Sequence, residues 1–151
     1  YDTYFKKINL GYTFEIVTTN CETGRSEYLQ ERSGNKHRLN EIALASSSLP
    51  YVSKIVKVDG RPILDGGIID SIPLMRAIET GHKKNVVICT RNKGWRDTGS
   101  DLKIPKFIYK NYPRLRVVLS HRLKAYNRQL DMIDEYEERG DIIAIPSYSP
   151  H

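Results

Sequence analysis

The stretch GRPILDGGIIDSIP, residues 60–73, constrains the fold more than any other part of the chain. Its apolar pair Ile63–Leu64 is typical of a buried strand, which runs directly into a single carboxylate, Asp65. The double glycine Gly66–Gly67 then removes side chains beside that carboxylate, so that a substrate or another backbone could approach it. Residues of the kind that favour helix starts follow, namely Asp70, Ser71 and Pro73. The sequence therefore predicts a strand, an open turn and a helix.

An Asp-Gly pair at residues 59–60 separates the runs 54–59 and 61–64, and this is the strongest short hairpin signal in the sequence. Further strands are predicted at residues 12–19, 86–89 and 142–145, and further helices at residues 39–47, 74–80 and 120–139. The last of these helices is predicted to be capped by Ser120 and ended by Gly140. The helix at 39–47 must end before Pro50, which places the serines at 46–48 at a surface corner. A fully apolar strand after a helix, as at residues 86–89, is typical of a covered parallel sheet. The order of elements predicts an α/β fold.

Length and composition fit one soluble globular domain. The chain has 151 residues, 39% of them hydrophobic and 28% charged, and no apolar run approaches the roughly 20 residues of a membrane span. It opens at Tyr1 without a methionine or a secretion leader, so we expect a cut start. Cys21 and Cys89 are far apart and form no CxxC motif, which favours two reduced thiols and a cytoplasmic compartment.

Positive charge is concentrated in residues 91–128. This segment holds 11 of the 24 Lys and Arg residues and two acidic residues, and aromatic side chains interleave with the charges. Residues 91–113 lack a clear periodicity, and the rest of the segment contains the start of a long helix. We therefore expect residues 91–128 to include an excursion from the hydrophobic core. The segment is open to three interpretations: a solvated surface, a rim that meets anionic lipid, and a nucleic-acid contact, for which no binding motif is present. The residues that we expect at a peripheral membrane rim are Arg91, Lys93, Trp95 and Arg96.

An aspartate at a strand end before two glycines can be a general base, a metal ligand or a turn former. The metal interpretation is disfavoured because the four histidines are scattered and no carboxylate cluster accompanies them. The residues of this motif alone leave the other two possibilities open.

Residues 39–91 resemble the C-terminal half of the patatin-like phospholipases, in particular the small bacterial esterases of that family. The resemblance is carried in order by ALASSSLP at residues 43–50, LDGG at 64–67, IDSIPL at 69–74 and VVICTR at 86–91. Upstream, YTFEIVTTNCETGR is similar to the strand and turn before the family's helix. The helix at residues 122–140 and the following IIAIPS are similar to its usual ending.

The resemblance implies a three-layer α/β/α fold with a mainly parallel sheet, and a lipid acyl hydrolase with a serine–aspartate dyad. It assigns the general base to Asp65, and it implies no metal and no cofactor. With no histidine relay, the carboxylate must reach the serine hydroxyl directly. The residues expected to line the substrate site are Gly66, Gly67, Ser46, Ser47, Ser48 and Pro50.

The sequence departs from the family pattern upstream of these motifs. The GxSxG nucleophile turn and the glycine-rich oxyanion loop are both missing from residues 1–151. We therefore expect residues 1–151 to be the C-terminal portion of a single patatin-like domain. The serines at 46–48 are disfavoured as a replacement nucleophile, because no strand-to-helix turn presents them. Asp70–Ser71 also replaces the asparagine that commonly follows DGG in the family.

Two function classes remain at this stage. In the first, the chain is part of a hydrolase, supplies the base for a lipid or ester substrate and is inactive alone. In the second, it is a non-catalytic binding or scaffold module with affinity for anionic lipid surfaces. A missing half would also leave an unpaired sheet edge or an apolar face, which predicts self-association.

Overall fold

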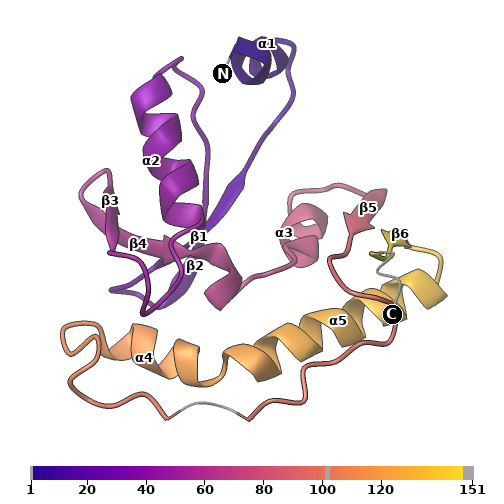
Figure 1. The fold of residues 1–151 in the computed structure, drawn as a ribbon. Helices are drawn as coiled ribbons and strands as arrows, with labels where there is room; N and C mark the ends of the chain where they lie inside the picture. Colours follow the sequence, from indigo (N-terminus) through magenta and orange to yellow (C-terminus); the bar gives the residue numbers. More distant parts are fainter. Residues whose placement is uncertain (1, 101–102, 148–151) are drawn as a thin grey trace. The chain divides into compact units, whose positions relative to one another are not determined.

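The computed structural model describes residues 2–100 and 103–147 (Figure 1). Their contacts divide the chain into two compact units. The first contains the described residues up to Ile69 together with Ile104–Leu119, and the second contains Asp70–Lys103 together with the described residues from Ser120 onward. Each unit has a hydrophobic core of its own.

The first unit contains a four-stranded sheet in the order β2-β1-β4-β3, and every neighbouring pair is antiparallel. Its strands are β1 (Ile16–Asn20), β2 (Arg25–Leu29), β3 (Val56–Val58) and β4 (Arg61–Asp65). The hairpin predicted at residues 59–60 is confirmed, because β3 and β4 pair across Asp59 and Gly60. Both residues have positive φ, 50° and 78°, as a primed turn between twisted strands requires.

The first unit also contains helices, several of which pack against this sheet. They are α1 (Asp2–Asn9), α2 (Lys36–Ser46), the 3-10 helix η1 (Gly66–Ile68) and α4 (Pro113–Ser120), which the unit contains up to Leu119. Figure 1 shows α2 beside the β3–β4 hairpin, and it buries Ile42 and Ala45 against Val58 and Ile63. A second cluster brings Leu64 of β4 against buried residues that include Cys21 and Leu115.

The prediction of a mainly parallel sheet is wrong for this unit. The polar segment RSEYL, residues 25–29, forms β2 although its sequence lacks a strand-like apolar run. Tight turns at residues 21–24 and 59–60 can connect only antiparallel neighbours. The fold class is mixed α/β, as expected, and the three-layer arrangement stays a prediction.

The second unit contains a two-stranded sheet, in which β5 and β6 pair in parallel. Its elements are α3 (Leu74–Glu79), β5 (Asn85–Ile88), α5 (Arg122–Glu138) and β6 (Ile142–Ile145). The predicted end of the long helix at Gly140 is confirmed, because this glycine follows the C-cap with φ 77°. The predicted cap is wrong, because Ser120 ends α4 and His121 precedes α5.

One face of the β5–β6 sheet is not covered by the described residues. The inward face carries Val87 and Ile142, which pack with Leu74 and Ile133 in the core of the unit. The outward face carries four aliphatic side chains, whose exposed fractions are Val86 61%, Ile88 79%, Ile143 64% and Ile145 48%. The expectation of a covered strand at residues 86–89 is therefore wrong for this face, since alternate residues of a strand point to opposite sides.

The two cysteines are free, and Cys21 is buried whereas Cys89 is half-buried. Burial raises the pKa of the Cys21 thiol to about 12, so it remains protonated at neutral pH. No helix among residues 2–100 and 103–147 has the length and hydropathy to cross a bilayer.

Glu31 is a buried carboxylate that ties the β2–α2 loop to α2. It accepts hydrogen bonds from the backbone and hydroxyl of Ser33 and from the Arg38 guanidinium at 3.0 Å. Arg38 also donates to both carboxylate oxygens of Asp59, at 3.0 and 2.8 Å. The Ser33 hydrogen bonds, and then Arg38, hold the pKa of Glu31 at about 2 although burial opposes that shift.

The free energy of unfolding should fall as the pH is lowered from 4.5, the ordinary value for this carboxyl, toward about 2. The unfolded chain binds a proton at Glu31 at a higher pH than the folded chain, so the stabilisation is complete above pH 4.5. The variant Glu31→Gln should lose about 1–3 kcal/mol in urea unfolding at pH 7, and less at pH 3. The exposed control Glu22→Gln should have little effect at either pH. An equal loss for Glu31→Gln at both pH values would contradict this assignment.

Candidate active site

β4 places Asp65 at the end of a buried strand in the first unit. Residues 62–64 are buried, whereas Asp65 is half-buried. The Asp65 amide donates to the carbonyl of Ser48 at 3.1 Å, and its carbonyl accepts from the Thr19 hydroxyl at 2.8 Å. In the sheet register, Asp65 lies opposite Thr18 of β1. The backbone of Asp65 is therefore fixed by β1 and by the segment after α2.

One of the two carboxylate oxygens of Asp65 accepts a hydrogen bond within the first unit. Its Oδ1 accepts from the Gly67 amide at 2.7 Å and so caps the 3-10 helix η1, which is the role of a turn former. Its Oδ2 accepts no hydrogen bond from any residue that the structure describes. A rigidly held carboxylate with a second oxygen available can also accept a proton from an incoming hydroxyl.

Gly66 is required for packing. It is buried, and a Cβ atom at this position would lie 2.5 Å from the carbonyl carbon of Val17 and closer still to its carbonyl oxygen. The space beside Gly66 is thus filled by β1 of the same unit, and the missing side chain lets η1 close onto that strand. The predicted contacts of Gly66 and Gly67 with substrate stay predictions.

The three serines at the end of α2, Ser46, Ser47 and Ser48, direct their hydroxyls to main-chain carbonyls. Ser46 donates to Val17 at 2.8 Å, and Ser48 to Leu44 at 2.7 Å. Ser47 donates back into its own helix. We expected all three at a surface corner, and this is wrong for Ser48, which is buried. Pro50 is also buried.

None of the three serine hydroxyls donates to Asp65, and the backbone bond from Asp65 to Ser48 joins the two segments. The serine segment therefore positions the aspartate. Its predicted role in lining the substrate site stays a prediction.

Sequence reasoning missed the buried polar residues of β1. Thr18, Thr19 and Asn20 are all buried, and Thr18 donates to the carbonyl of Glu27. Asn20 donates to the Glu27 carboxylate at 2.7 Å and accepts from two backbone amides of the following turn. Three polar residues at the end of an otherwise apolar strand were the available signal, because buried polar groups need partners.

The basic residues predicted at a membrane rim lie in the second unit, and two of them are already paired. Lys93 contacts Glu137 at 2.6 Å, and Arg96 contacts Asp131 and Asp134 of α5 at 2.8 and 2.7 Å. Arg91 instead lies over the ring of Trp95, with its guanidinium carbon 4.6 Å from the ring centroid. The acidic partners recur at a spacing of three along α5, which places them on one helix face.

The chain is similar to a known protein family over part of its length. Residues 6–78 match the family model Patatin, described as patatin-like phospholipase. The matched stretch contains Asp65, the double glycine and the three serines. This result confirms the resemblance for these residues and is consistent with a fragment of a patatin-like protein. No curated protein matches the chain.

Proposed function

We propose that this chain supplies the general base of a lipid acyl hydrolase, and that the base is Asp65. The observation that carries the proposal is a half-buried carboxylate at a strand end, inside the patatin-like stretch, with Oδ2 available to a hydroxyl. In the natural protein, a serine from a segment outside residues 1–151 would donate its proton to this oxygen and attack the ester carbonyl. The protonated Asp65 would pass that proton to the leaving alcohol oxygen as the ester C–O bond breaks and the acyl-serine forms. The regenerated carboxylate would then take a proton from the water that attacks the acyl-serine carbonyl, and it would return this proton to the serine oxygen as the fatty acid leaves.

The hydrogen bonds of the serines at 46–48 support a nucleophile from outside the chain. Each hydroxyl would have to give up a bond to a main-chain carbonyl before it could reach Asp65. Ester hydrolysis by an upstream-extended form of the chain, with and without Asp65, tests the assignment.

The alternative is a binding module for anionic lipid surfaces. The pairing of Lys93 and Arg96 with acids of α5 removes two of the four residues on which that interpretation depends. Peripheral membrane contact and the cytoplasmic compartment inferred from cysteine usage stay predictions.

The outward face of β5 and β6 supports the predicted self-association. Parallel sheets usually have both faces covered, yet four aliphatic side chains are exposed here. We expect sedimentation velocity to show concentration-dependent association of the 151-residue chain. The variant Ile88→Lys should shift the association equilibrium toward the monomer. The control Thr98→Lys adds the same charge at an exposed polar position of this unit and should leave the association unchanged. A monodisperse monomer at high concentration would contradict the prediction.

A further inference from the structure

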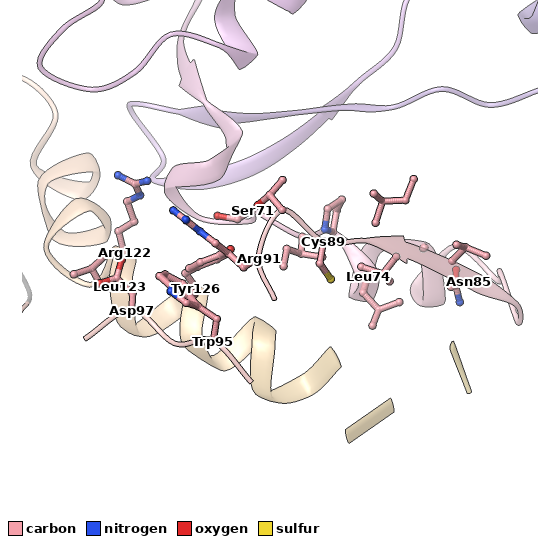
Figure 2. Close-up of a pocket in the computed structure, with 17 residues that line it drawn as sticks. Ser71, Leu74, Asn85, Cys89, Arg91, Trp95, Asp97, Arg122, Leu123 and Tyr126 are labelled. Carbon is pink, nitrogen blue, oxygen red and sulfur yellow. The ribbon is translucent and has the colours of Figure 1, made fainter. Parts of the chain in front are cut away.

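The second unit forms an open pocket of about 560 Å³, a size common for small-molecule sites (Figure 2). It is lined by residues of α3, all of β5, the segment after β5 and the start of α5. Buried Leu74 and Val87 and half-buried Leu123 give it apolar walls. The polar lining includes two arginines, Arg91 and Arg122.

The described lining of this pocket carries a net positive charge, because it holds two arginines and one aspartate. Neither Arg91 nor Arg122 forms an ion pair with a residue that the structure describes. The one acidic residue among the described lining residues, Asp97, uses its carboxylate to accept from the Gly99 amide at 2.9 Å. The two arginines thus differ from Lys93 and Arg96, which are held by acids of α5.

Both arginines line the same pocket. In Figure 2 they lie at the same end of the pocket, near Ser71, whereas Leu74 and Asn85 lie toward the other end. Stacking on Trp95 orients Arg91, and Arg122 is the first residue of α5. Arginine presents a planar fork of donors that matches the oxygens of a phosphate or a carboxylate, and such charge-assisted bonds are strong.

We propose that this pocket binds an amphiphile with an anionic head, a phosphate or a carboxylate, whose head group is held by Arg91 and Arg122. The apolar chain lies along Leu74, Val87 and Leu123. The site goes beyond the proposed function, because none of its residues is assigned to hydrolysis and binding requires no turnover. Loss of catalysis in an Asp65 variant would leave it unaffected.

The sole tryptophan of the chain lines this pocket, so its fluorescence reports on occupancy. We expect octyl phosphate and octanoate, added below their micelle concentrations, to change the Trp95 emission with saturation. Octanol and inorganic phosphate should each bind at least about tenfold more weakly, since each lacks one half of the recognised group. Octanol binding as tightly as octyl phosphate would overturn the role of the charges. Inorganic phosphate binding as tightly would overturn the role of the apolar walls.

Substitution of the two arginines tests whether the ligand binds in this pocket. Arg91→Gln and Arg122→Gln should each weaken octyl phosphate binding about tenfold in calorimetry, which does not depend on the tryptophan environment. Arg128→Gln, at an exposed position of α5 outside the pocket lining, should leave the affinity unchanged. Raising the salt concentration should weaken octyl phosphate but not octanol, and this comparison needs no variant. Unchanged affinity in both pocket variants, or no salt dependence, would overturn the proposal.

Discussion

Replacing Asp65 by asparagine should lower ester hydrolysis about 10²–10⁴-fold in an upstream-extended form that also carries the serine segment. Asparagine keeps an oxygen that can accept from the Gly67 amide, so the cap of η1 is preserved. It cannot take a proton from serine, so the loss reports on the base and not on the turn. The rate on a short-chain chromogenic ester and on a phospholipid measures the effect.

Asp70→Asn is the matched control, because it makes the same chemical change five residues later in the same motif. Its carboxylate accepts from Gln129 at 2.8 Å, and an amide oxygen can take over that bond. Activity within about threefold of the parent is expected for this variant. Full activity of Asp65→Asn would exclude Asp65 as the base. Asp65-dependent hydrolysis by the 151-residue chain alone would place the nucleophile among Ser46, Ser47 and Ser48.

Replacing Gly66 by alanine should cost about 3 kcal/mol or more of unfolding free energy, a large share of the roughly 5–15 kcal/mol of a typical domain. The new Cβ atom would meet the Val17 carbonyl carbon at 2.5 Å, so either β1 or η1 must move. The midpoint of urea unfolding, followed by circular dichroism, measures the loss.

Gly34→Ala is the control for the glycine-to-alanine change itself. Gly34 has φ +85°, but a Cβ atom added there would have no neighbour within 4 Å among the described residues. The expected cost is therefore the backbone strain alone, about 1–2 kcal/mol. If Gly66→Ala were no more destabilising than Gly34→Ala, the close approach to Val17 would not be the reason for glycine at position 66.

Local signals in the sequence were enough to predict the hairpin at residues 59–60, the strand end at Asp65 and the helix end at Gly140. Each depends on neighbours within a few residues, such as an Asp-Gly turn or a glycine after a helix. The direction of the main sheet was not predictable in this way, because it depends on β2. That strand is polar and pairs with β1 along one edge of the sheet.

The site was predictable only in part, because several contacts join residues that are far apart in the chain. The Thr19 hydroxyl reaches the Asp65 carbonyl across 46 residues, and Lys93 reaches Glu137 across 44. The charge of residues 91–128 alone overestimates the positive charge that is free to meet a partner. Acidic residues of α5 beyond position 128, namely Asp131, Asp134 and Glu137, pair with Lys93 and Arg96.

The contact between Gly66 and Val17 also limits which sequences can carry this fold. The two atoms nearest to the missing Cβ belong to the backbone of Val17, and every amino acid has them. No smaller side chain at position 17 could make room for a larger residue at position 66. A substitution at Gly66 therefore has no compensating partner at position 17, and the residue next to Asp65 is fixed by main-chain geometry.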